Sequence, residues 1–199
     1  ESVNEYKDLN DYHGFKSETL RHLAFDPNLT EEEFNQSKSN EITQNLFTQL
    51  IDAYNRKNQN IKDKALVVFN KINKERGKEV KNILVPFSDG KKSLNVSINL
   101  KKAIETNGEE IINAFERYVA LAIIDENWKD HLRELDDLKQ SANNASIEQK
   151  DPLLIYKLES FNLFQSMISS LNSEMTSILF KGDIATQDSE DVKEAKEIK

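Results

Sequence analysis

The side chains that most often carry chemistry are sparse in this sequence. Its three histidines are His13, His22 and His131, and no pair has the His-Glu-x-x-His spacing of a zinc protease. His131 and Glu134 lie one helical turn apart, so a single helix face could offer both to a metal ion. The alternative is that His131 flanks an apolar helix face and hydrogen-bonds a neighbouring group. We favour this second interpretation, because a metal site needs further ligands that the sequence does not indicate.

Three clusters of adjacent carboxylates are candidates for acid–base chemistry, and we expect each of the three to be solvated. Two of them fall in predicted first helical turns, where the helix dipole favours negative charge. The third lies on a predicted exposed helix face. Paired catalytic acids need apolar shielding that drives their pKa values apart, and nothing near these clusters supplies it. The clusters are Glu31-Glu32-Glu33, Glu109-Glu110 and Asp136-Asp137.

The glycines and cysteines exclude several classes of site. The five glycines, at positions 14, 77, 90, 108 and 182, are too scattered for a P-loop or a dinucleotide-binding loop. We therefore expect no nucleotide hydrolysis through such a loop, no catalytic residue and no cofactor in this chain. The absence of cysteine excludes a disulfide scaffold, a thiol nucleophile and a thiolate zinc site. A hydrolase built on His131 and nearby acids is poorly supported.

Composition narrows the possible partners. The formal net charge of −8 disfavours general nucleic-acid binding, which needs a concentrated basic surface. Hydrophobic residues make up 37% and charged residues 31%, a balance typical of a helix-rich protein with a modest core. No apolar run approaches the roughly 18 residues of a membrane span, and no signal peptide opens the sequence. Because the sequence begins at Glu1 with a helical pattern already under way, we expect the chain to be a piece of a longer protein.

The longest regular pattern runs from Ile111 to Gly182 and predicts an antiparallel helical hairpin. Apolar residues recur in both limbs at steps of three and four, which places them on one side of each helix. Asp151-Pro152 opens the second limb, with Asp as N-cap and Pro in the first turn. The stripes are Leu121, Ile124, Trp128, Leu132, Leu135 and Leu138 in the first limb, and Phe161, Phe164, Ile168, Leu171, Met175 and Ile178 in the second.

Two features of this hairpin have two interpretations each. Trp128, the only tryptophan, lies in the middle of its stripe, and the pattern alone favours a core position. The alternative is that Trp128 packs against a separate domain. The connector from Ser141 to Lys150 is either a simple turn or the tip of a projecting finger, and composition favours the turn.

The remainder of the chain predicts a mainly α fold with one β-hairpin. We expect helices at 1–27, 30–37, 40–57, 61–76 and 100–106, with an interruption at Asn58-Gln-Asn60. A β-hairpin is expected at about 80–98, around the Ser88-Asp-Gly90 turn. Its first strand is rich in β-forming residues, and its second strand alternates apolar and polar residues. The predicted domains are residues 1–110, residues 111–182 and a charged, disordered tail at 183–199.

Two stretches resemble the SecA preprotein translocase ATPase family, in the C-terminal part of its helical scaffold. The first is Leu121-Ala-Ile-Ile-Asp-Glu-Asn-Trp-Lys-Asp-His-Leu-Arg-Glu-Leu-Asp-Asp-Leu-Lys-Gln140. The second is Glu148-Gln-Lys-Asp-Pro152 followed by Tyr156-Lys-Leu-Glu-Ser-Phe161. The preceding region resembles the family's helical wing domain, most closely its Bacteroidetes-type version, at Val85-Pro-Phe-Ser-Asp-Gly90 and Asn99-Leu-Lys-Lys-Ala-Ile-Glu-Thr-Asn-Gly108.

The resemblance implies a non-catalytic part of an ATP-driven protein translocase. ATP and Mg would bind in motor domains outside this chain, on the cytoplasmic face of the inner membrane. The hairpin would be the two-helix finger, whose tip contacts the SecYEG channel and the secretory preprotein. The implied tip residues are Asn143, Asn144, Ala145, Ser146, Ile147, Glu148, Gln149 and Lys150. The implied scaffold residues, which regulate ATP turnover and face the nucleotide-binding domains, are Trp128, His131, Leu132, Asp136, Leu138, Lys139 and Gln140.

The sequence departs from the family pattern at the tip. Family members commonly carry an aromatic residue, typically Tyr, where this chain has Ile147, and often a basic residue where it has Ala145. The family's zinc-binding tail is also missing from this sequence. From the apolar stripes we further expect the chain by itself to pair with a second copy. The alternative function is a free-standing helical adaptor that binds partner helices in an apolar groove.

Overall fold

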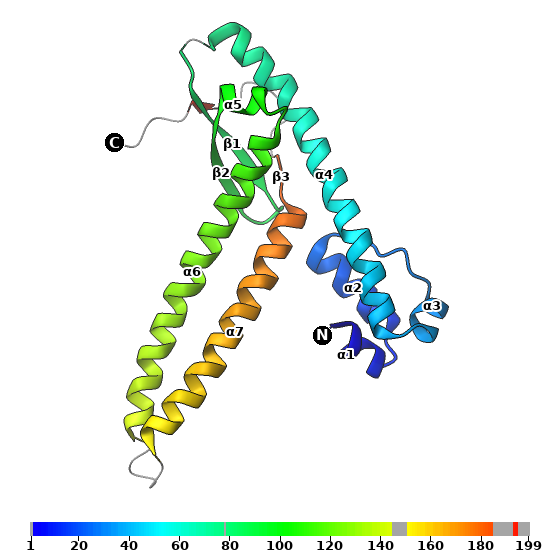
Figure 1. Cartoon of the computed structure of the whole chain (residues 1–199), viewed down its shortest axis with the longest axis vertical. Coiled ribbons are helices and arrows are strands. Elements are labelled where there is room, and N and C mark those ends of the chain that lie inside the picture. Colours follow the sequence, from blue (N-terminus) through cyan, green and yellow to red (C-terminus); the bar gives the residue numbers. More distant parts are fainter. Residues whose placement is uncertain (1, 78, 145–150, 185–192, 195–199) are drawn as a thin grey trace. The chain divides into compact units, whose positions relative to one another are not determined.

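The computed structural model describes residues 2–77, 79–144, 151–184 and 193–194 (Figure 1). It confirms a mainly α fold with a small antiparallel sheet. The chain divides into two compact units, one formed by Glu1–Phe115 with Phe180–Lys199 and the other by Glu116–Leu179. The elements are α1 (Ser2–Asp8), α2 (Tyr12–Leu23), α3 (Glu31–Gln36), α4 (Ser39–Arg76), β1 (Asn82–Ser88), β2 (Ser93–Asn99), α5 (Leu100–Glu105), α6 (Glu109–Asn144), α7 (Pro152–Lys181), β3 (Asp183–Ile184) and β4 (Lys193–Glu194).

An aromatic cluster holds the first three helices on the start of α4. The rings of Phe15 and Phe34 stack at 5.1 Å, and the Tyr12 hydroxyl donates a hydrogen bond to the Leu29 carbonyl at 2.6 Å. The predicted helix over 1–27 is divided in two, because Asn10 adopts a left-handed φ of 53°. Asp11 then caps α2 by accepting a hydrogen bond from the Gly14 N–H at 2.8 Å.

Helix α4 corrects the predicted interruption at residues 58–60. It runs without a break for 38 residues, through Asn58-Gln-Asn60. Asn58 is buried on the helix face that also carries Ile61, Ala65 and Phe69. Low helix propensity is a weak preference that packing on one face readily overrides. Two predicted helices are therefore one.

The predicted β-hairpin is confirmed, with one buried face. In the β1–β2 pair, Ile83 faces Ile98 and Val85 faces Val96, and all four side chains are buried. The alternate residues of β2, from Ser93 to Asn99, are exposed. On the same buried face, the ring of Phe87 stacks on that of Phe115 from α6 at 4.2 Å. Sheet and helices thus share one core, which an isolated hairpin would lack.

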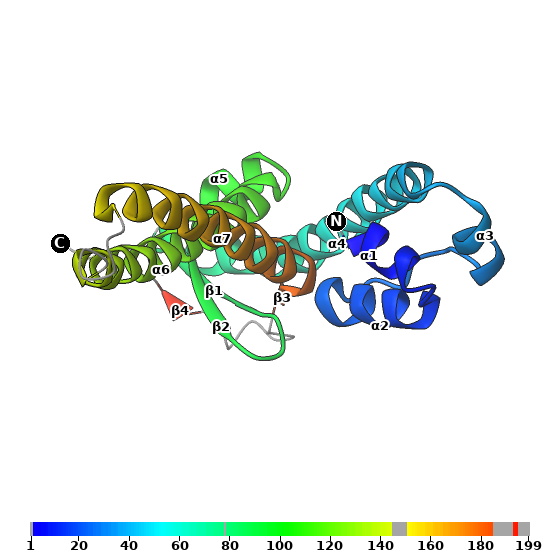
Figure 2. The same cartoon turned by 90° about the horizontal axis from the view of Figure 1, so that it is seen from below.

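The end of the chain returns to the first unit after α7. Here β3 pairs with β1 through Phe87 and Ile184, and β4 pairs with the other end of β1, so β1 lies between β2 and these two short strands (Figure 2). Lys57 Nζ donates to the Gly182 carbonyl at 3.0 Å. The sequence predicted a disordered tail from residue 183, and both short strands differ from that prediction. The rest of the tail lies outside the described residues.

The N-terminus of α3 offers a direct test of the predicted capping box, which the structure confirms. Thr30 Oγ1 accepts a hydrogen bond from the Glu33 N–H at 3.2 Å, and the Glu33 carboxylate accepts one from the Thr30 N–H at 2.9 Å. We expect Thr30→Ala to lower the free energy of unfolding by about 1 kcal/mol, because it leaves a helix N–H unpaired. Urea denaturation followed by circular dichroism measures this loss.

Glu33 gives the same cap a pH dependence. The hydrogen bonds from the Thr30 N–H and hydroxyl hold the pKa of Glu33 below its ordinary value of 4.5. A lowered pKa in the folded state stabilises the protein above pH 4.5 and ceases to do so as the pH falls through the folded value. The stability difference between the wild type and Glu33→Ala should therefore shrink on acidification. A difference that grows at low pH would contradict this assignment.

Candidate functional site

The second compact unit is a hairpin of two long antiparallel helices, α6 beyond Phe115 and α7 up to Leu179 (Figure 1). The seam between them buries Ile123, Ala142 and Met167. A polar contact crosses it where Asn127 Nδ2 donates to the Glu174 carboxylate at 3.2 Å. The hairpin is therefore held by a narrow row of contacts and leaves most of each helix surface uncovered.

His131 lies inside this seam. Only 4% of the residue is exposed, and its ring lies 5.7 Å from the Trp128 ring and 5.9 Å from the Phe164 ring. We predicted that His131 would hydrogen-bond a neighbour, but within the described residues its Nδ1 atom is buried with no hydrogen-bond partner. Glu134, the other half of the metal alternative, is exposed. In the described part of the chain no three His, Cys, Asp or Glu side chains gather as a metal site would require.

The buried face of α6 is offset by about one position from the predicted stripe. Ile123 and His131 face α7, whereas Trp128 is 47% exposed, so the core position that the pattern favoured for Trp128 is wrong. The helix carries two neighbouring apolar rows, and periodicity alone cannot say which one meets the partner helix. We call the uncovered row of α6 the exposed row, defined by Leu121, Ile124, Trp128 and Leu132, each at least 46% exposed.

Helix α7 also leaves large apolar side chains uncovered. Phe161 and Phe164 of its predicted stripe are 59% and 43% exposed. Met175 and Ile178 of the same stripe are half-buried. Further toward the start of α7, Leu153, Leu154 and Leu158 are all exposed. Contiguous apolar surface of this kind marks a contact surface for another protein or domain.

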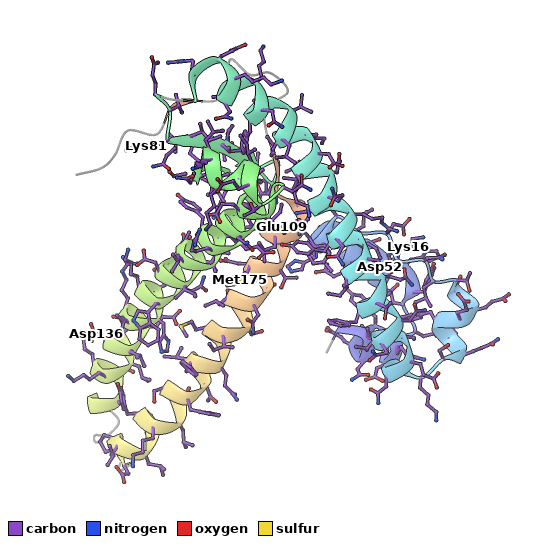
Figure 3. All side chains as sticks on the ribbon, turned by 45° about the horizontal axis from the view of Figure 1, so that its top comes forward. Lys16, Asp52, Lys81, Glu109, Asp136 and Met175 are labelled. Carbon is purple, nitrogen blue, oxygen red and sulfur yellow. The ribbon has the colours of Figure 1, made fainter. Side chains whose placement is uncertain are left out.

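The three carboxylate clusters differ in their exposure to solvent. Asp136 and Asp137 are exposed on α6, as predicted, and Figure 3 labels the first of them. The three acids of α3 are exposed in its first turn, also as predicted. Glu110 corrects the prediction, because it is 8% exposed and pairs with Lys102 at 2.6 Å. Its neighbour Glu109 pairs with Lys62 at 2.6 Å.

The implied tip falls at the far end of this hairpin. Helix α6 ends at Asn143 and Asn144. The other implied tip residues, Ala145 to Lys150, lie outside the described residues. The structure therefore does not test the replacement of the family's aromatic residue by Ile147. Asp151 begins the return, and its Oδ1 accepts a hydrogen bond from the Leu153 N–H at 2.9 Å, which confirms the predicted N-cap. The implied scaffold residues are dispersed over both faces of α6: His131 is buried, Leu138 half-buried, and Trp128, Leu132, Asp136, Lys139 and Gln140 are exposed.

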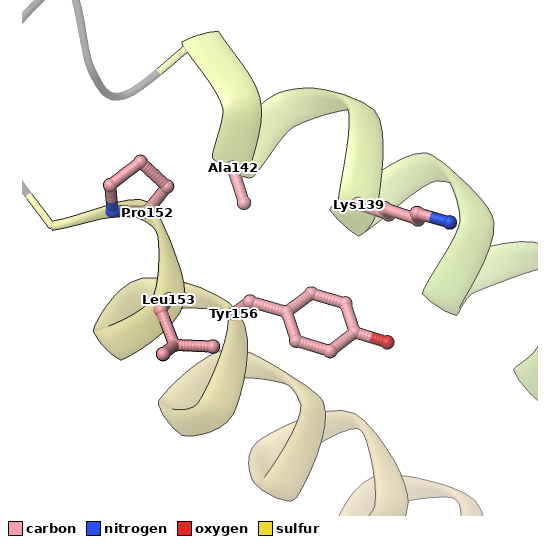
Figure 4. A pocket seen from close by; sticks show the side chains of 5 residues that line it. All are labelled: Lys139, Ala142, Pro152, Leu153 and Tyr156. Carbon is pink, nitrogen blue, oxygen red and sulfur yellow. The ribbon is translucent and has the colours of Figure 1, made fainter.

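A cavity of about 390 Å³ opens between the two helices just behind the tip (Figure 4). Ala142 and Lys139 line it from α6, and Pro152, Leu153 and Tyr156 line it from α7. Sequence reasoning missed Leu153 and Tyr156. The signal was the N-cap at Asp151, which places residues two and five positions later on the first turns of α7, with Leu153 and Tyr156 three apart on one face.

One finding concerns membranes. None of the helices in the described ranges is both long enough and apolar enough to cross a bilayer.

The structure is that of a mainly helical protein with apolar side chains uncovered on its hairpin. Comparison with protein families gives a match over residues 2–183 to the family described as SecA Wing and Scaffold domain. The chain belongs to the SecA family. Its similarity to Bacteroidetes-type sequences is confirmed by relatives from that group.

Three relatives illustrate the match, each described as protein translocase subunit SecA. The chain is 46% identical to that of Azobacteroides pseudotrichonymphae over 97% of its own length, 40% identical to that of Cytophaga hutchinsonii over 94%, and 42% identical to that of Phocaeicola vulgatus over 94%. It spans only 17% of the length of each of these relatives. No solved structure matches the chain.

Proposed function

We propose that this chain is the non-catalytic coupling part of a protein translocase, and that its hairpin is the moving contact. In this proposal ATP, with Mg, is hydrolysed by nucleotide-binding domains outside the chain. The hairpin carries the resulting movement to a secretory preprotein at the cytoplasmic mouth of a SecYEG channel. The family match supports a role in protein translocation, because the relatives are named as translocase subunits.

The observation that carries the proposal is the exposed row on α6. Leu121, Trp128 and Leu132 are 63%, 47% and 46% exposed. Burying apolar surface is worth about 25 cal/mol per Å², so uncovered side chains of this size favour docking on another surface. The relatives extend far beyond the matched region, which supports a docking surface on their other domains. We infer that the row faces the nucleotide-binding domains and regulates their ATP turnover.

The free-standing adaptor remains the second candidate. The exposed row supports it as well, since an uncovered apolar row could equally bind a partner helix. The family match favours the translocase, because the adaptor does not account for a match over residues 2–183 to a wing and scaffold domain. The reading frame upstream of the chain separates the two: helicase-type motor motifs support the translocase, and their absence supports the adaptor.

A site-specific photo-crosslink from position 147 tests the tip. A photoreactive residue would replace Ile147 in the full-length protein, and a secretory preprotein would be stalled midway through the channel. We expect nucleotide-dependent adducts to the stalled preprotein. The matched control places the same photoreactive residue at exposed Val67 on α4, where we expect no adduct to the preprotein.

Two other outcomes of this experiment are informative. Adducts from position 147 to the nucleotide-binding domains alone would assign the hairpin a regulatory role and place the preprotein contact elsewhere. Equal adducts from positions 147 and 67 would mean that the preprotein approaches both without selection, and the proposed tip contact would be wrong.

A further inference from the structure

The cavity behind the tip combines an apolar floor with two hydrogen-bond donors. Ala142 is 4% exposed and forms the inner wall, while Pro152 and Leu153 form the end nearest the connector. Figure 4 shows the Tyr156 ring lying between the helices, with its hydroxyl and the Lys139 amine pointing the same way, away from Pro152. One end of the cavity is therefore apolar and the other polar.

The size of the cavity limits what it can hold. The cavity has a volume of about 390 Å³. This is room for one large side chain with its adjoining backbone, and it lies at the lower end of known ligand pockets.

The donors define the charge of the occupant. Within the described residues neither the Lys139 amine nor the Tyr156 hydroxyl has a hydrogen-bond or ion-pair partner. An ammonium group has only donors, and a phenol hydroxyl that points the same way is free to donate as well. Both favour a carboxylate or backbone carbonyls as the partner. Charge-assisted hydrogen bonds of this kind are stronger than neutral ones.

We propose that this cavity binds an extended polypeptide segment in which a large apolar side chain is followed by an acidic residue. The apolar side chain occupies the end formed by Ala142, Pro152 and Leu153. The neighbouring carboxylate accepts hydrogen bonds from Lys139 and Tyr156. This inference rests on the proposed function, since it assigns a preferred local sequence to the polypeptide that the hairpin contacts.

Fluorescence anisotropy with short labelled peptides tests the assignment on the 199-residue chain. The reference peptide is Gly-Ser-Leu-Asp-Ser-Gly, and two others replace its leucine with serine or its aspartate with lysine. We expect saturable binding of the reference peptide. The serine peptide should bind about tenfold more weakly, because it loses the buried apolar group. The lysine peptide should bind more weakly still, since it places two cations together.

Two conservative variants locate the site. Lys139→Gln should weaken binding of the reference peptide about twofold to fivefold, the range expected for a solvent-accessible ion pair, and reduce the preference for the aspartate peptide over the lysine peptide. Tyr156→Phe keeps the ring and removes only the hydroxyl, so it should weaken binding while leaving the leucine preference intact. Lys157→Gln is the matched control and should leave binding unchanged. Circular dichroism confirms that each variant is folded.

Three results would overturn the inference. They are equal binding of all the peptides, equal effects of Lys139→Gln and Lys157→Gln, and binding that disappears as the chain concentration rises, which would assign the cavity to a second copy. The proposed function is judged separately by the crosslink from position 147. If those adducts form while the peptides bind without preference, the hairpin contact stands and only the role of the cavity falls.

Discussion

Replacing Phe115 with alanine is expected to lower the free energy of unfolding of the first compact unit by about 3–5 kcal/mol. Phe115 is fully buried, and its ring stacks on that of Phe87 at 4.2 Å and lies 5.7 Å below the Lys57 amine. Its removal leaves a cavity at the point where β1, α4 and α6 meet. Domains are stable by only about 5–15 kcal/mol, so this single change removes a large part of the total.

Urea denaturation with two probes measures the effect. Circular dichroism reports the helices of both units, whereas fluorescence of Trp128, the only tryptophan, reports the hairpin. Phe47→Ala is the matched control, because Phe47 is a phenylalanine of the same unit with 59% of its surface exposed. We expect a loss well below 1 kcal/mol for the control. Equal losses for the two variants would mean that Phe115 does not pack as the structure describes.

Replacing Trp128 with alanine in the full-length translocase is expected to raise ATP hydrolysis in the absence of preprotein by about fivefold or more. If the exposed row docks on the nucleotide-binding domains and holds them in one arrangement, loss of its largest member releases that restraint. A coupling free energy of about 1 kcal/mol, the low end for linked sites, corresponds to a fivefold change. A phosphate-release assay at saturating ATP measures the rate.

Matched variants separate regulation from damage. Trp128→Phe keeps an aromatic contact and should give a smaller increase. Val67→Ala removes an even more exposed apolar group from α4 and should leave the rate unchanged. Because Trp128 is 47% exposed, the alanine variant should keep its helical signal. A folded Trp128→Ala variant with the wild-type rate would show that the exposed row does not regulate the motor.

Much of the fold could be predicted from local sequence signals. The capping box at Thr30 and Glu33, the N-cap at Asp151 and the alternation in β2 each depend on residues close together in the chain, and each is present. Asn58 shows where local reasoning fails. Its type favours a break, but its position on the buried face of α4 keeps the helix continuous. Tertiary packing decides such cases, and a single sequence does not reveal it.

The candidate site was less predictable than the fold. Periodicity located both apolar stripes, but it placed Trp128 in the core and His131 at its edge, the reverse of the structure. An offset of one position around α6 buries His131 in place of Leu132 and leaves Trp128 exposed. The cavity at Lys139 and Tyr156 depends on how two helices approach each other. The apolar periodicity within either helix does not predict how closely the two helices approach each other.

The first compact unit is assembled from two segments that are far apart in the chain, and this sets an order of events during synthesis. Its core is complete only when Phe180 reaches Tyr54, with ring centroids 5.3 Å apart, and β3 pairs with β1. A ribosome adding about 5–20 residues per second must first deliver the whole hairpin. Until then the edge of β1 that pairs with β3 stays unpaired for several seconds. A nascent chain cut just before residue 180 should therefore offer that edge to chaperones, and one cut after residue 184 should hide it.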